Sequence, residues 1–123
     1  MPNWCSTDIE IIGPTAEMKK LAAIVNSNDD PGFLQTICPG PEEWNYDWSV
    51  QNWGTKWDIS EGHADVEELA TAHPILQSKL SIATQTAWAP PLEALDYYLQ
   101  ENPEYIVKCY YYEPGMDFAG IWE

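Results

Sequence analysis

The stretch WCSTDIEII, residues 4–12, alternates between two kinds of side chain over its whole length. Alternation with a period of two is typical of a β-strand that has one buried face and one open face. The two sides separate a mostly apolar set from a polar one: Cys5, Thr7, Ile9 and Ile11 against Ser6, Asp8 and Glu10. We therefore expect a strand with an acidic open face, which the Gly13-Pro14 pair ends.

Two amphipathic helices are predicted from apolar residues that recur at helical spacing. The first follows Thr15, a good N-cap residue, and carries an apolar stripe formed by Met18, Leu21, Ala22 and Val25. The second begins at Pro90-Pro91, ends at Asn102-Pro103, and carries Leu92, Leu95 and Leu99 on one side. Each stripe should cover the buried face of a sheet.

Three further strands are predicted in the second half of the chain, over residues 79–88, 105–113 and 118–122. The middle one is rich in Tyr, Val and Ile, which favour strands. Its alternation opposes Val107, Cys109 and Tyr111 to Ile106, Lys108, Tyr110 and Tyr112. If this alternation is correct, Tyr110 and Tyr112 share the open face with Asp8 and Glu10.

Three segments have weaker patterns. Residues 33–48 are expected to form an ordered loop with at most one short element, because Pro39-Gly40-Pro41 interrupts any periodicity. Residues 53–59 are expected to form a second strand with Trp53, Thr55 and Trp57 on one face. Residues 65–73 are expected to form a short extra helix, because Asp65 to Glu68 resembles a capping box and Pro74 follows.

The resulting order is strand, helix, strand, small insertion, strand, helix, strand, and one additional strand. This order predicts an α+β fold of the ferredoxin-like split βαβ type, with an antiparallel sheet and two main helices on one face. The extra helix near 65–73 and the extra C-terminal strand are additions to that pattern. A chain of 123 residues is the usual size of one domain, so residues 1–123 are expected to form a single domain.

Four segments resemble one known family. They are MPNWCS at residues 1–6, NWGTKWD at 52–58, TAWAPP at 86–91, and YEPG at 112–115 followed by FAG at 118–120. In this order they resemble the YubB/Api92-like ferredoxin-like domain family of phage, prophage and plasmid proteins. The resemblance implies the same fold and a mobile genetic element as source, and it supplies no activity or catalytic residues. The chain departs from the family at Thr7-Asp8, where a basic residue and Ser are usual, and at residues 65–78, which look like an insertion.

Charge favours a basic partner. The chain has 20 acidic residues, five Lys and no Arg, for a net charge of −15, which repels nucleic acid. We expect a non-enzymatic protein-binding module that inhibits a host nucleic-acid-handling or defence complex, such as a CRISPR or restriction system, by occupying its basic surface. The expected binding residues are Asp8, Glu10, Tyr110, Tyr112, Asp65, Glu67 and Glu68. Two alternatives stay open: the charge only keeps the protein soluble, or the domain is a structural accessory.

The segment NWGTKWD offers a different kind of site, for a small ligand or an enzymatic reaction, at Trp53, Lys56, Trp57 and Asp58. We favour a core position for both indoles, because rings at even spacing on one strand face usually lie under helices. No catalytic residue and no cofactor is assigned. His63 and His73 lack the further ligands of a metal site. Three scattered cysteines, no visible leader and no long apolar run are typical of a cytoplasmic protein with reduced thiols.

Overall fold

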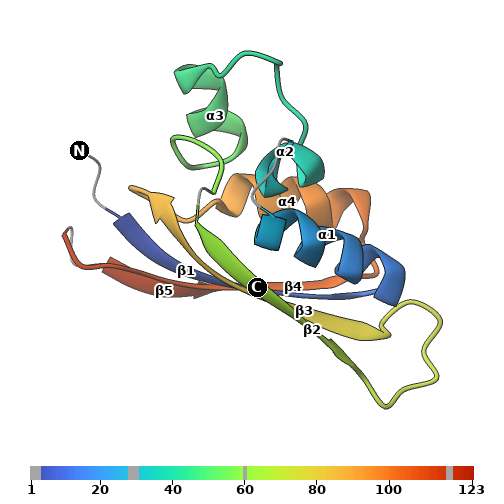
Figure 1. Ribbon diagram of the computed structural model, residues 1–123. Helices are drawn as coiled ribbons and strands as arrows, with labels where there is room; N and C mark the ends of the chain where they lie inside the picture. The colour runs from blue at the N-terminus through green and yellow to red at the C-terminus, as the bar shows by residue number, and fades with distance from the viewer. Residues whose placement is uncertain (1–3, 28–30, 60, 116–117) are drawn as a thin grey trace.

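The computed structural model describes residues 4–27, 31–59, 61–115 and 118–123. Within these residues the chain forms five strands and four helices (Figure 1). In chain order they are β1 (Trp4–Gly13), α1 (Thr15–Ser27), α2 (Phe33–Ile37), α3 (Tyr46–Asn52), β2 (Gly62–Glu68), β3 (Ser78–Ala87), α4 (Leu92–Glu101), β4 (Ile106–Glu113) and β5 (Phe118–Trp122).

The strands form one sheet in the order β2-β3-β1-β4-β5, and every neighbouring pair is antiparallel. β1 lies in the middle between β3 and β4, and the helices lie on one side of the sheet (Figure 1). The first four strands have the arrangement of a ferredoxin-like split βαβ fold, and β5 extends it at the C-terminal edge. The predicted α+β class, the helices on one face and the extra C-terminal strand are confirmed.

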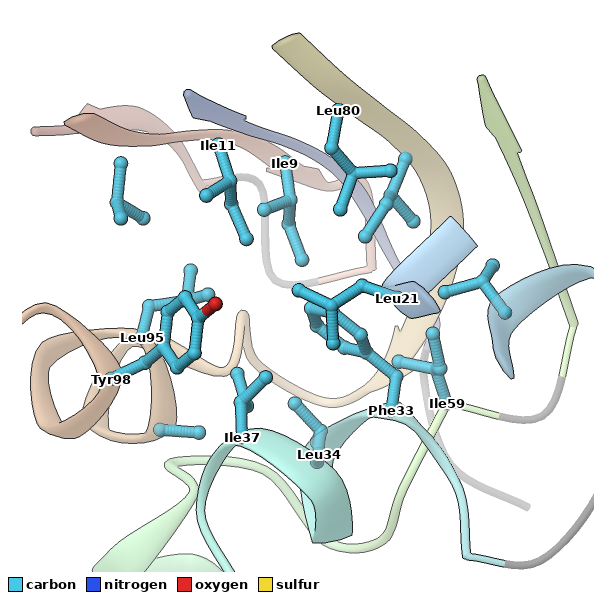
Figure 2. Close-up of a cluster of buried hydrophobic side chains, with 14 of the residues drawn as sticks. Ile9, Ile11, Leu21, Phe33, Leu34, Ile37, Ile59, Leu80, Leu95 and Tyr98 are labelled. Atoms are coloured by element: carbon cyan, nitrogen blue, oxygen red, sulfur yellow. The ribbon is translucent and has the colours of Figure 1, made fainter. Parts of the chain in front are cut away.

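The core forms where the apolar faces of the predicted strands meet the helices (Figure 2). The predicted stripe of α1 is buried in full, and Leu95 of α4 is buried with it. Figure 2 labels side chains of this cluster from the sheet and from three helices: Ile9, Ile11 and Leu80 of β1 and β3, Leu21 of α1, Leu95 and Tyr98 of α4, and Phe33, Leu34 and Ile37 of α2, together with Ile59. The open face of β1 is therefore left free of helices.

The predicted helix at residues 65–73 is wrong. Residues 62–68 form β2, which pairs with β3 so that Asp65 lies opposite Ser81 and Glu67 opposite Lys79. The capping-box pattern is overridden because Ala64 and Val66 pack under α1 only when the segment alternates as a strand. The turn that follows uses His73, whose Nδ1 accepts hydrogen bonds from the backbone N–H groups of Ile75 and Leu76.

The predicted strand at residues 53–59 is also wrong, and the preceding loop is more ordered than expected. Residues 33–48 contain α2 and the start of α3, and Trp53 is the C-cap residue of α3. Gly54 then has a φ of +84°, a left-handed conformation outside the β region. Instead of pairing with a strand, the segment is attached to the sheet through Thr55, whose hydroxyl donates to the carbonyl of Ala87 at 2.8 Å.

Candidate functional site

The open face of the sheet is organised in rows of residues that lie opposite one another on neighbouring strands. One row across all five strands consists of His63, Ala83, Asp8, Tyr110 and Ile121. Partners in an antiparallel sheet project from the same face, so the predicted neighbours Asp8 and Tyr110 are confirmed as adjacent. Tyr112 lies in the next row, opposite Ser6.

A second row brings the carboxylates of two strands to this face. It consists of Asp65, Ser81, Glu10 and Lys108. Asp65 was predicted on a helix, and it reaches the open face because β2 is a strand. A shallow hollow of about 320 Å³ is lined by residues of both rows, among them Asp8, Glu10, His63, Asp65 and Tyr110.

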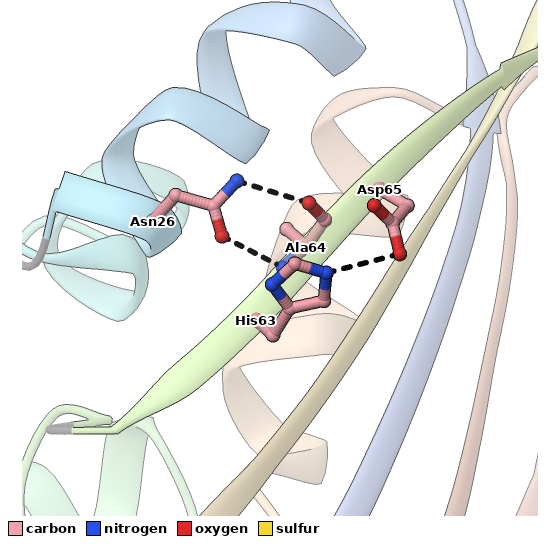
Figure 3. Close-up of polar contacts among 4 residues, drawn as sticks. All are labelled: Asn26, His63, Ala64 and Asp65. Atoms are coloured by element: carbon pink, nitrogen blue, oxygen red, sulfur yellow. Dashed lines mark hydrogen bonds and ion pairs between the residues drawn. The ribbon is translucent and has the colours of Figure 1, made fainter.

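Part of the negative charge on this face is already paired. Glu10 lies 3.7 Å from the Lys79 ammonium, and Asp65 lies 3.2 Å from Nε2 of His63 (Figure 3). Asp8 and Glu67 form no ion pair with any other described residue. These two exposed carboxylates are the ones whose charge is most available to a partner.

Glu68 does not belong to the open face. It alternates with Ala64 and Val66 on the helix side of β2, and its carboxylate lies 3.9 Å from the ammonium of Lys19 in α1. Glu68 is therefore not on the face that carries Asp65 and Glu67, and its part in partner binding stays a prediction. In the predicted helix Asp65 and Glu68, three residues apart, would have been neighbours, whereas a strand places them on opposite faces.

The part of the open face formed by β4 and β5 is aromatic and aliphatic. Tyr112 is 49% exposed and Ile121 is 65% exposed, and Tyr110 and Ile106 also face the solvent. Sequence analysis placed Tyr110, Tyr112 and Ile106 here and missed Ile121, Lys79 and His63. The pairing of β5 with β4 was the missing information, because the register, and not the alternation alone, places Ile121 beside Tyr110.

The residues of the NWGTKWD segment have separate roles. Trp53 is 6% exposed and its indole N–H donates to the carbonyl of Cys38 at 2.8 Å, so its predicted core position is confirmed. Trp57 is only half-buried and lies against Trp4, with ring centroids 6.2 Å apart. The Lys56 ammonium lies 4.8 Å from the centroid of Trp57 and 5.3 Å from that of Trp88.

Asp58 is bound to the N-terminus of α2. Its carboxylate accepts hydrogen bonds from the backbone N–H groups of Leu34 and Gln35, at 2.9 and 3.0 Å, and from its own neighbour Ile59 at 2.8 Å. Such contacts satisfy helix N–H groups that have no partner within the helix. Asp58 therefore fixes the fold at this point, and its oxygens are engaged by the chain itself.

A cavity of about 670 Å³ lies beside this segment, between α2, α3 and residues 53–58. Its lining includes four indoles, those of Trp44, Trp48, Trp53 and Trp57, together with the carboxylates of Glu42, Glu43 and Asp58. Three of the four residues predicted for an alternative ligand site line it, and Lys56 is outside the lining. Sequence analysis missed Trp44, Trp48, Glu42 and Glu43, because residues 33–48 had no recognisable periodicity.

The three thiols are buried in the core. Burial raises the pKa of Cys109 to about 12, with smaller contributions from Cys5 and Asp8. Burial also raises the pKa values of the Cys5 and Cys38 thiols. A thiol that holds its proton at neutral pH is a poor nucleophile, so none of the three is suited to covalent catalysis.

No family model, curated protein or solved structure matches the chain. In the part of the chain that the structure describes, no helix is long and apolar enough to cross a membrane. Among the same residues, no three His, Cys, Asp or Glu side chains come together in a way that could hold a metal ion.

Proposed function

We propose that this protein is a non-enzymatic binding protein that docks the open face of its sheet onto a basic protein surface. The observation that supports this most is the row in which Asp8 lies between His63 and Ala83 on one side and Tyr110 and Ile121 on the other. It places an ion-pairing group directly beside exposed aromatic and aliphatic side chains.

This composition suits a protein partner. Interfaces between proteins are enriched in Tyr at their centres and place charged groups around them. Tyr110, Tyr112 and Ile121 would form the apolar part of the contact on β4 and β5, and Asp8 and Glu67 beside it would meet Lys or Arg of the partner. Arg binds a carboxylate through two parallel hydrogen bonds and also stacks on aromatic rings, so this face offers both kinds of contact.

The partner in this proposal is a complex of the host cell that handles nucleic acid or acts in defence, and the site of action is the host cytoplasm. A channel that binds phosphates is lined with Lys and Arg, and a protein of net charge −15 competes for the same groups. The resemblance to phage and plasmid proteins of the YubB/Api92-like family points in the same direction. If the protein occupies a channel that binds phosphates, added DNA or RNA should release it from its partner.

Affinity capture tests the proposal: the wild type and matched variants are each used to capture proteins from extracts of the host cell, and the captured proteins are compared. Asp8→Lys and Tyr110→Ala change the open face. Asp96→Lys and Tyr97→Ala make the same changes at exposed positions of α4 on the helix side. We expect one set of basic proteins to be retained by the wild type and by both α4 variants and lost with both open-face variants.

Three results would contradict the proposal. The first is a set of captured proteins that the α4 variants lose and the open-face variants keep, which would place the binding surface on the helices. The second is retention that neither salt nor nucleic acid reduces, because attraction between exposed charges is screened at a distance of about 8 Å at physiological salt. Capture of no basic protein at all would also overturn it.

A further inference from the structure

The cavity beside α3 is independent of the open face, because its lining residues belong to helices and loops and none belongs to a strand. Its volume of about 670 Å³ lies in the range of sites for small organic ligands, roughly 300–1,000 Å³. Four of its lining residues are tryptophans, in a chain that has seven. The chemistry of the site therefore follows from indole rings and the groups around them.

The walls of the cavity are held by hydrogen bonds within the chain. The Gln35 side chain donates to the carbonyl of Gly40 at 2.9 Å and accepts from its N–H at 3.1 Å. The Asn45 side chain caps α3 by accepting from the N–H of Trp48 at 2.9 Å. The Trp44 indole N–H donates to the carbonyl of Lys56 at 2.8 Å. A site with walls already fixed loses little conformational entropy on binding.

These bonds also determine what the walls can offer a ligand. The indole N–H groups of Trp44 and Trp53 donate to backbone carbonyls, and Asp58 accepts from the backbone of α2. The lining also contains the aromatic surface of the rings and the exposed carboxylates of Glu42 and Glu43. The rings of Trp48 and Trp53 stand at 85° to each other, so these two indoles give the cavity walls of different orientation.

The charge of the lining has one sign. Glu42, Glu43 and Asp58 are acidic, and no Lys or His occurs among the lining residues that the structure describes. An indole ring attracts a cation through its negative face, and the attraction is strongest where the cation is weakly hydrated. Trp57 already demonstrates this contact within the protein, because the Lys56 ammonium lies 4.8 Å from its ring centroid.

We propose that this cavity binds an alkylated ammonium cation, with the indoles around the alkyl groups and the carboxylates of Glu42 and Glu43 near the charge. Alkyl groups fit walls made largely of indole rings, two of which already use their N–H groups within the chain, and the positive charge fits a lining whose charged groups are all acidic. A bare metal ion does not fit, since such ions need several converging oxygen ligands. The cation is carried either by a free small molecule or by a methylated lysine side chain.

Calorimetric titration with two matched compounds tests the nature of the ligand. Choline is the cationic probe, and 3,3-dimethylbutan-1-ol is its neutral counterpart, with carbon in place of the charged nitrogen. We expect choline to bind about tenfold or more tightly, because only the cation gains from the rings and carboxylates. Equal affinities, or no binding of choline at millimolar concentration, would overturn the proposal.

Variants locate the site in the same titration. Trp44→Leu removes a ring that is 56% exposed, and we expect it to weaken choline binding about fivefold to tenfold. Trp88→Leu is the matched control, because Trp88 is 50% exposed and outside the cavity lining, and it should leave the affinity unchanged. Glu42→Gln with Glu43→Gln should weaken binding and reduce its dependence on salt. Equal effects of Trp44→Leu and Trp88→Leu would contradict the assignment.

A second arm distinguishes the two sources of the cation. A short peptide with one trimethylated lysine is compared with choline and with the same peptide unmethylated. Tighter binding of the trimethylated peptide than of choline assigns the site to a modified protein, and the reverse assigns it to a free small molecule. The indole N–H signals of the cavity tryptophans should shift in the NMR spectrum with either probe. The outcome is separate from the open-face variants, which do not alter this cavity.

Discussion

The side-chain amide of Asn26 binds both backbone groups of Ala64, and so joins the last turn of α1 to the edge strand β2 (Figure 3). Its Nδ2 donates to the Ala64 carbonyl at 2.9 Å, and its Oδ1 accepts from the Ala64 N–H at 2.9 Å. Edge strands expose unpaired backbone groups that can recruit another chain. Asn26 occupies one pair of these groups at the β2 edge of the sheet.

Loss of the Asn26 amide should lower stability. We expect Asn26→Ala to reduce the free energy of unfolding by about 1–3 kcal/mol, because two backbone groups lose their partner. Asn26→Asp should also destabilise, because a carboxylate cannot donate to the Ala64 carbonyl. Urea denaturation measures both changes. Gln51→Ala removes an exposed amide of α3 and should stay within about 0.5 kcal/mol of the wild type. A loss in Gln51→Ala as large as that in Asn26→Ala would contradict this role.

The segments that sequence analysis predicted correctly are those whose periodicity is enforced by burial. β1 and α1 each pack one face against the core, so the pattern of their residues is also the pattern of their contacts. Residues 65–68 were predicted as part of a helix because β2 is an edge strand with a largely polar composition, and its pairing with β3 makes it a strand. Residues 53–59 alternate by composition, yet they form turns and bends, and Gly54 among them has a positive φ.

Asp58 provides the second stability prediction. We expect Asp58→Ala to destabilise the protein by about 1–2 kcal/mol, the usual cost of removing a helix cap. The backbone N–H groups of Leu34 and Gln35 should then exchange with solvent more rapidly, since they lose their acceptor. Denaturation and hydrogen exchange give the two measurements. Asp47→Ala, in the first turn of α3, is the control and should change stability by only a few tenths of a kcal/mol.

A conformational constraint at Gly54 leads to the third prediction. A side chain is disfavoured at its φ of +84°, so Gly54→Ala should cost about 1–2 kcal/mol in thermal or urea unfolding. The added Cβ would also lie 3.3 Å from the backbone nitrogen of Glu93. Gly54→Asn adds the same Cβ but enters left-handed conformations more easily, so it should cost less. A larger cost for Asn than for Ala would mean that crowding by Glu93, and not the backbone angle, dominates.

The candidate surfaces were predictable to different degrees. The open face required only the alternation of β1 and β4, so Asp8, Glu10, Tyr110 and Tyr112 were placed together correctly. Asp65 and Glu67 reach the same face through a strand that the sequence did not indicate, and Glu68 is therefore excluded from it. The cavity is formed largely by irregular backbone. There, tertiary contacts determine where each side chain lies, so the periodicity of the sequence does not predict its position.

The stability of the protein at alkaline pH should depend on two buried groups, the Cys109 thiol and the Tyr98 hydroxyl, which keep their protons to higher pH in the folded chain than in the unfolded one. Burial raises the pKa of Cys109 from 9.0 to about 12. Burial, and then the neighbouring Glu17 carboxylate, raise the pKa of Tyr98 above its usual value. Between pH 9 and 12 the unfolded chain therefore binds fewer protons than the folded one, so the free energy of unfolding falls as the pH rises through this window.

For Cys109 alone the full effect is on the order of 4 kcal/mol, at about 1.4 kcal/mol for each pH unit. We expect Cys109→Ala to be less stable than the wild type at pH 8, because a small cavity forms, and to lose less stability than the wild type between pH 9 and 11. Tyr98→Phe should flatten the same dependence. Urea denaturation at a series of pH values measures the slopes. Val107→Ala also opens a small cavity in the core but removes no titratable group, so it should keep the wild-type slope. If Cys109→Ala keeps it as well, the buried thiol does not control alkaline stability.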